Sequence, residues 1–163
     1  CAHLSWGDGV FGEGESAYLE LLGCRHRYQV TLSRALHFGT PPRRVVNAAR
    51  ASIAAIEVAL ATARPGATCA DVANAMLGII RKHGIEKSTR CGYATGIAYP
   101  PTSGERSYSL HPGDRSPLAA GMTFHIHPNL AFEDWGLYIT DTMLITETGA
   151  EPLTHLPRHL VIR

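Results

Sequence analysis

The sequence predicts an α+β domain in which two long helices lie on one face of a curved, mainly antiparallel sheet. Three observations predict this class: the first third alternates as strands do, two helical stripes follow, and alternating segments return after residue 86. The order of strands, helices and strands is typical of helices that cover one face of an antiparallel sheet. At 163 residues the chain suits one compact domain, and two domains of ordinary size would not fit.

Residues 17–22 and 28–38 are predicted to pair as a hairpin, with residues 23–27 as the connection. The first run is apolar apart from Glu20. The second run alternates between an apolar face that includes Arg34 and a polar face. The polar face carries Gln29, Thr31, Ser33 and His37.

Two amphipathic helices are predicted next, over residues 40–63 and 68–83. Thr40 before two prolines is a candidate N-cap of the first helix. Its apolar stripe consists of Val46, Ala49, Ile53, Ile56 and Leu60. In the second helix Thr68 and Asp71 have the spacing of a capping box. The second stripe consists of Val72, Met76, Ile79 and Ile80, and Gly84 is a C-terminal stop.

The last part of the chain is predicted to hold a long loop and a second pair of strands. Residues 99–116 are rich in Pro, Gly and Ser, so we expect a loop long enough to be functional. Residues 121–129 and 136–146 alternate and are expected to pair. No third long helix is predicted after residue 86.

Composition excludes several classes of function. Fifteen Lys and Arg against fourteen Asp and Glu give a net charge of +1, which favours neither nucleic acid nor a membrane surface as partner. The longest weakly polar stretch, residues 49–63, is too short to span a bilayer. Four dispersed cysteines and no recognisable signal peptide indicate a cytoplasmic protein. Because the chain starts at Cys1, we expect a piece of a longer polypeptide.

Three kinds of side chain are candidates for chemistry. Glu20 within an apolar strand is either paired with Arg25, Arg27 or Arg34 or has a function, because an unpaired buried carboxylate is costly. His125 and His127 share one face of a strand, where they could bind a metal or, alternatively, one could hydrogen-bond within the sheet while the other faces solvent. For Cys91 a buried structural thiol is favoured over a nucleophile, and Glu133 and Asp134 are expected to be solvated.

Several motifs then follow one another in the order of a known family. They are Glu20–Gly23, Ser33-Arg34, Gly66–Val72, Cys91–Ile97, Leu118–Pro128 and Tyr138–Gly149. This series resembles the creatinase/aminopeptidase ("pita-bread") family over nearly the whole chain. The resemblance implies that residues 1–163 are the C-terminal catalytic pita-bread domain, truncated at its N-terminus.

Peptidases of this family hold two metal ions, and the resemblance implies which residues of this chain stand at the ligand positions. These are Glu20 and Thr31 for two Asp, Tyr93 for His, and His127 and Thr140 for two Glu. Three of the five lack a carboxylate or imidazole, so a dinuclear site is not expected. We therefore predict no metal and no other cofactor, and expect the five positions to converge.

The metal-free branch, with creatinase and the ectoine hydrolases, is the more similar one, and the ectoine hydrolases are closest. The resemblance implies a metal-independent hydrolase of a non-peptide C–N bond in a small compatible solute or amidine-like compound, acting as a homodimer. The implied catalytic residues are His3, Glu20 and His127, with Tyr93, Tyr99, Glu105, Trp135 and Thr140 binding substrate. Two alternatives stay open: a Xaa-Pro aminopeptidase or dipeptidase with a degenerate metal site, and a non-catalytic fragment.

Overall fold

The computed structural model describes residues 7–99 and 107–163 and contains a hairpin, two helices and a short-stranded sheet. The elements are, in order, β1 Ser16–Arg25, β2 Tyr28–His37, α1 Arg43–Thr62, α2 Cys69–Lys82, β3 Gly92–Thr95, β4 Thr123–Ile126, β5 Leu130–Ala131, β6 Gly136–Leu137, β7 Asp141–Ile145, β8 Ala150–Pro152 and β9 Val161–Ile162. The sheets have the orders β1-β2-β9, β3-β4-β7-β8 and β5-β6. Pairing is antiparallel except between β2 and β9, which confirms the predicted α+β class.

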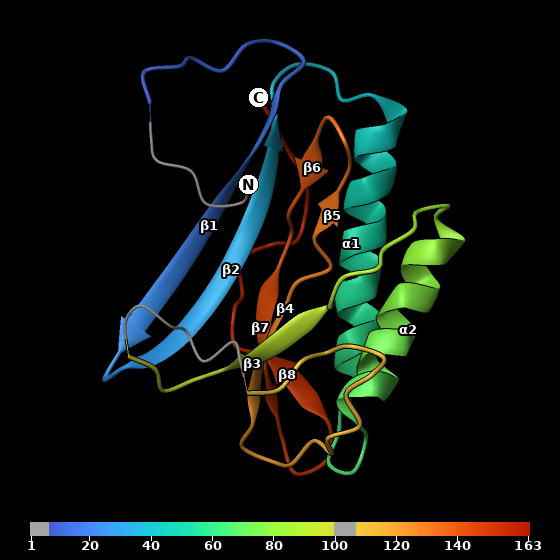
Figure 1. Ribbon diagram of the computed structural model, residues 1–163. Helices are drawn as coiled ribbons and strands as arrows, with labels where there is room; N and C mark the ends of the chain where they lie inside the picture. The colour runs from blue at the N-terminus through green and yellow to red at the C-terminus, as the bar shows by residue number, and fades with distance from the viewer. Residues whose placement is uncertain (1–6, 100–106) are drawn as a thin grey trace.

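The four-stranded sheet β3-β4-β7-β8, here called the central sheet, lies between the two helices and the β1-β2 hairpin. In Figure 1 the helices lie on one side of this sheet and the hairpin on the other. An antiparallel bridge between Ser33 and Thr140 joins β2 to the segment that leads into β7. Among the described residues α1 and α2 are the only long helices, as predicted.

The hairpin turn is tighter than the sequence predicts. Strands β1 and β2 stay paired as far as Arg25 and Tyr28, so only His26 and Arg27 connect them. Both connecting residues have positive φ, 49° and 68°, as a two-residue type I′ turn requires. Neither is Gly, Asn or Asp, so the sequence carried no strong turn signal.

The polar face of β2 is the buried one. Thr31, Ser33 and His37 are buried, whereas Val30, Leu32 and Leu36 on the other face are half-buried. This is the reverse of an ordinary amphipathic strand. The strand therefore places a row of hydroxyl and imidazole groups inside the molecule.

Helix α2 begins and ends as predicted, but α1 does not. Thr68 caps α2 in a capping box with Asp71, and Gly84 follows the helix with φ of 73°. For α1 the N-cap is Pro42, with no side-chain capping bond, so the prediction of Thr40 as N-cap is wrong. The pair Pro41-Pro42 keeps the backbone extended for two residues beyond Thr40.

The predicted apolar stripe of α1 is only partly the buried face. Val46, Ile53 and Leu60 are half-buried. The buried residues are Val45, Ala48, Ala49, Ala51, Ser52, Ala55, Ile56 and Ala59. Small residues let a helix approach its neighbours closely, so close packing rather than side-chain size selects this face. By length and composition alone α1 could cross a membrane, which is weak evidence because the core helices of globular domains pass the same test.

Candidate active site

Strands β3 and β4 bring three rings together on one face of the central sheet. Tyr93 pairs with His125 across the two strands, and His127 lies two residues further along, so all three side chains share a face. The ring of Tyr93 lies 5.2 Å from that of His125 and 5.0 Å from that of His127, centroid to centroid. The two imidazole rings are 5.4 Å apart. This cluster forms the centre of the candidate site.

A chain of hydrogen bonds leads from this cluster to the hairpin. The Nδ1 atom of His125 is 2.9 Å from the Tyr93 hydroxyl, and its Nε2 atom is 2.8 Å from Thr140 Oγ1. Thr140 Oγ1 in turn donates to Ser33 Oγ at 3.0 Å. The chain Tyr93–His125–Thr140–Ser33 is continuous, and it uses both ring nitrogens of His125.

The predicted residues of the hairpin lie on the same face as Ser33. Glu20 stands directly opposite Ser33 in the register of β1 and β2. Thr31 lies two residues before Ser33 and is buried. Its backbone N–H donates to Thr142 Oγ1 at 3.1 Å, and its carbonyl accepts from the same hydroxyl at 2.8 Å. The face of β2 that carries Thr31 and Ser33 is therefore the face that contacts the central sheet, through Thr142 and Thr140.

Burial keeps both histidines of the site uncharged at neutral pH. Desolvation, opposed by the charge of Asp141, lowers the pKa of His125 to about 4. Desolvation also places the pKa of His127 well below its usual value, and nearby His125, Lys87 and Arg90 lower it further. A neutral imidazole offers one N–H donor and one acceptor.

The donor set does not fit a pair of metal ions. His125 uses both ring nitrogens in hydrogen bonds, and Thr31, Tyr93 and Thr140 present neutral oxygens instead of carboxylates. Divalent cations of peptidases need anionic oxygens or free imidazoles. Within residues 7–99 and 107–163 no group of three His, Cys, Asp or Glu side chains has the geometry to hold a metal. In this arrangement His125 has no unused ring nitrogen to join His127 in binding a metal.

The structure decides some of the alternatives that the sequence left open for Glu20, for the two strand histidines and for Cys91. Arg34 pairs with Asp141 at 2.9 Å, so it is not the partner of Glu20. His125 hydrogen-bonds within the sheet region, as one alternative expected. His127 does not face solvent, because only 9% of it is exposed. Cys91 is fully buried and burial raises the pKa of its thiol to about 11, which confirms the structural role.

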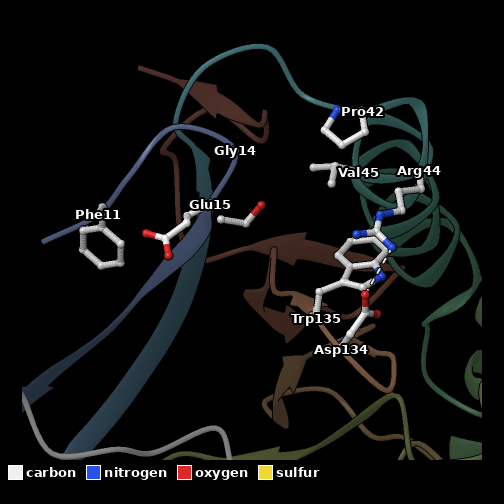
Figure 2. Close-up of a pocket in the computed structure, with 10 residues that line it drawn as sticks. Phe11, Gly14, Glu15, Pro42, Arg44, Val45, Asp134 and Trp135 are labelled. Atoms are coloured by element: carbon white, nitrogen blue, oxygen red, sulfur yellow. Dashed lines mark hydrogen bonds and ion pairs between the residues drawn. The ribbon is translucent and has the colours of Figure 1, made fainter. Parts of the chain in front are cut away.

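Trp135 lies in a separate pocket at the other end of the molecule, shown in Figure 2. The pocket has a volume of about 400 Å³ and is bounded by Phe11 and Glu15 on one side. On the other side the Arg44 guanidinium lies 5.2 Å from the Trp135 ring and 3.4 Å from the exposed carboxylate of Asp134. A second hollow shares Trp135 and extends along the stacked rings of Tyr18 and Tyr138, which are 4.4 Å apart. The Trp135 ring thus contacts Arg44 and, at 4.3 Å between ring centres, Phe132, rather than the rings of Tyr93, His125 and His127.

The remaining predicted residues are placed as follows. Tyr99 is exposed, and the Arg27 guanidinium lies 4.8 Å from its ring. His3 and Glu105 lie outside the described residues, so their predicted roles stay predictions. The site also contains two residues that the sequence prediction left out, His125 and Ser33. Their signal was the alternation that puts them on the same faces as His127 and Thr31.

Comparison with known proteins gives matches of three kinds. The sequence pattern of metallopeptidase family M24 matches residues 1–147. The ectoine hydrolase of Halomonas elongata is 45% identical over 162 residues, which cover 99% of this chain and 41% of that protein. The crystal structure of dipeptidase PepE from Mycobacterium ulcerans superposes with a TM-score of 0.87 at 26% identity, over 98% of this chain and 43% of that one.

A fold match at lower identity agrees with these. The X-Pro aminopeptidase of Thermotoga maritima superposes with a TM-score of 0.84 at 22% identity, over 96% of this chain and 44% of that one. The chain thus spans less than half the length of the relatives it matches. The matches confirm the resemblance on which the sequence-based fold was assigned.

Proposed function

The chain belongs to metallopeptidase family M24, and we propose that its parent protein is a metal-independent hydrolase of a non-peptide C–N bond in a small compatible solute such as ectoine. The observation that carries the proposal is that Tyr93 and Thr140, at two of the five ligand positions, belong to the neutral hydrogen-bonded chain Tyr93–His125–Thr140–Ser33. The identity of 45% to an ectoine hydrolase supports the substrate class. Because the chain covers 41% of that relative, the activity is proposed for the whole protein.

Hydrolysis without a metal requires that water be activated and that the leaving nitrogen receive a proton. In our proposal these steps fall to His3 and Glu20. An imidazole titrates near neutrality and can move protons in both directions. Glu20 has the carboxylate that either removes a proton from water or holds a protonated amidine. His127 contacts the substrate as a neutral imidazole, since its lowered pKa makes it a poor source of protons.

The test is hydrolysis of ectoine, creatine and a Xaa-Pro dipeptide by the full-length protein before and after exhaustive chelation. We expect turnover of ectoine or creatine to survive chelation. Glu20→Gln and His3→Ala should each lower kcat by about a hundredfold or more, the usual scale for losing an acid–base group. Glu133→Gln, an exposed carboxylate outside the site, is the matched control and should leave kcat unchanged.

A second candidate function is a Xaa-Pro peptidase with a single degenerate metal site. The fold match to an X-Pro aminopeptidase keeps it open, and Glu20 and His127 are the two positions that still offer ligand groups. Stoichiometric metal after purification, loss of turnover on chelation and its return with Mn²⁺ or Zn²⁺ would favour this function. The same results would overturn the metal-independent hydrolase.

A further inference from the structure

A cluster of cationic side chains stands beside the ring cluster, and the mechanism above does not use it. Lys87 precedes β3 and is partly buried. Its ammonium donates to Thr89 Oγ1 at 2.6 Å and to the carbonyl of Asn129 at 2.9 Å. No carboxylate of the described residues pairs with it. Burying an ammonium is costly without a counter-charge, so this position favours an anionic ligand.

Arg90 brings a second positive charge to the same place. Its guanidinium lies 4.5 Å from the ring centre of Tyr93, whose ring is 5.0 Å from that of His127. A backbone hydrogen bond also joins the segment before β3 to the end of β4, since the N–H of His127 donates to the carbonyl of Cys91 at 2.9 Å. Lys87 and Arg90 are both close enough to lower the pKa of His127.

His127 itself lacks partners in this position. Neither Nδ1 nor Nε2 has a hydrogen-bond partner among the described residues, and only 9% of the residue is exposed to solvent. Buried polar side chains are satisfied in nearly all native structures, so an exception calls for an explanation such as a ligand. The N–H of this ring needs an acceptor, and the two neighbouring cations favour an acceptor with negative charge.

We propose that Lys87, Arg90 and His127, here called the cationic wall, bind a carboxylate group of the substrate. This inference rests on the proposed function and deepens it, since it makes the substrate an anion-bearing C–N compound with a fixed direction of binding. The carboxylate lies at the cationic wall, and a cationic amidine end is left to Glu20 on the hairpin. A cationic ring stacked on Tyr93 is disfavoured, because Arg90 already occupies one side of that ring.

The proposed function favours a carboxylate over a phosphate as the anion, because ectoine and creatine each carry one carboxylate and no phosphate. Two of the three ammonium protons of Lys87 are already used, and a neutral His127 has a single N–H.

The first experiment compares ectoine with the same ring carrying a primary amide in place of the carboxylate, using the full-length protein. We expect kcat/KM to favour ectoine. Lys87→Met and Arg90→Gln should each reduce that preference by about tenfold or more, the scale of a hydrogen bond to a charged group. Lys82→Met removes an exposed charge at the end of α2 and is the matched control. An unchanged preference in an active Arg90→Gln protein would overturn the proposal, even if Lys87→Met fails to fold.

The second experiment does not depend on turnover, so it separates failure of this inference from failure of the proposed function. Acetate and inorganic phosphate are titrated separately while the ring nitrogens of His127 are followed by ¹⁵N NMR. We expect acetate to shift the His127 signals and Arg90→Gln to weaken this response. A stronger response to phosphate would overturn the carboxylate assignment, and no response to either anion would overturn the site.

Discussion

Thr140 and Asp141 are neighbours in the sequence, yet they belong to two buried polar clusters of opposite character. On one face of the strand, Asp141 accepts hydrogen bonds from Arg34 at 2.9 Å and Thr154 at 2.8 Å and pairs with Arg158. On the other face, Thr140 belongs to the neutral chain that ends at Tyr93. Adjacent residues of an extended chain point to opposite faces, so one short segment serves both clusters.

Arg34 is the saturated centre of the Asp141 cluster. Arg34 makes five hydrogen bonds, which use every N–H of its guanidinium. Their acceptors are Asp141 Oδ1 and the carbonyl oxygens of Ser33, Thr140, Leu156 and Pro157. This arrangement fixes the chain beneath the site and holds the C-terminal segment against β2. Arg34 itself therefore has no N–H left for a ligand.

The ring cluster is unsaturated, because His127 keeps two ring nitrogens without partners in the described structure. The difference teaches that burial of polar groups has two meanings in this fold. A charged cluster whose central arginine uses every donor stabilises the domain, whereas a neutral cluster with unused groups is organised for a ligand.

The largest effect on stability is expected from Asp141→Ala. Removing the carboxylate leaves the buried charge of Arg34 without a counter-ion, which costs about 3–5 kcal/mol for buried pairs. Urea unfolding at neutral pH measures the change in the free energy of unfolding. Asp134→Ala is the control: its ion pair with Arg44 is 60–66% exposed, so a change of about 1 kcal/mol or less is expected. A similar small change for Asp141→Ala would show that the cluster does not act as a clamp.

The ring cluster should make stability fall as the solution is acidified. The pKa of His125 is lowered to about 4 in the folded protein, so the unfolded chain takes up protons more readily. The contribution of neutral His125 to the free energy of unfolding is fully present above about pH 6.5. It is lost as the pH falls from about 6.5 to 4. At about 1.4 kcal/mol for each pKa unit, the loss is roughly 3 kcal/mol. Unfolding midpoints across this range measure it.

His125→Gln keeps a polar side chain but removes this titration, so its stability should depend less on pH over the same range. His127 contributes in the same direction because its pKa is also lowered. An unaltered pH profile in His125→Gln would mean that other groups cause the acid sensitivity.

The smallest effect on stability is expected from His127→Leu, although this residue is as buried as its neighbours. The substitution breaks no hydrogen bond of the described structure, so the free energy of unfolding at pH 8 should change by about 1 kcal/mol or less, or rise. His125→Leu leaves Tyr93 and Thr140 without partners and should cost about 1–3 kcal/mol. Loss of several kcal/mol in His127→Leu would show that His127 is a structural residue.

The sequence predicted the local elements well because their signals are local. The capping box of Thr68 and Asp71 fixed the start of α2, and alternation located the hairpin and the paired strands near the end. The start of α1 was predicted two or three residues early, because Thr40 resembles a cap while the prolines after it hold the backbone extended. The stripe of α1 was only half right, because the buried face is selected by the fit of small residues to neighbouring elements.

The candidate site was predicted in its positions but not in its connections. Tyr93, His127 and Thr140 do lie around one centre, and Glu20 and Thr31 lie on the hairpin face joined to it. His125 was left out of the predicted site, although it is the residue that bridges Tyr93 and Thr140. His125 is bridged by Tyr93 and Thr140, which lie 32 and 15 positions away from it along the chain, whereas His127 is left without side-chain partners. Alternation along one strand does not reveal such distant partners.

By itself the sequence determined the fold class, the order of the elements and which polar residues stand at the positions matched to the metal ligands of the family's peptidases. These follow from periodicity, from caps and from motif order, each of which is written within a few residues. Only the tertiary structure decided that Arg34 serves Asp141 rather than Glu20, that the polar face of β2 is buried, and that His127 lies unpartnered beside Lys87 and Arg90. The physical reason is that hydrogen bonds and charges act over a few ångströms in space, and the chain folds distant segments into that range.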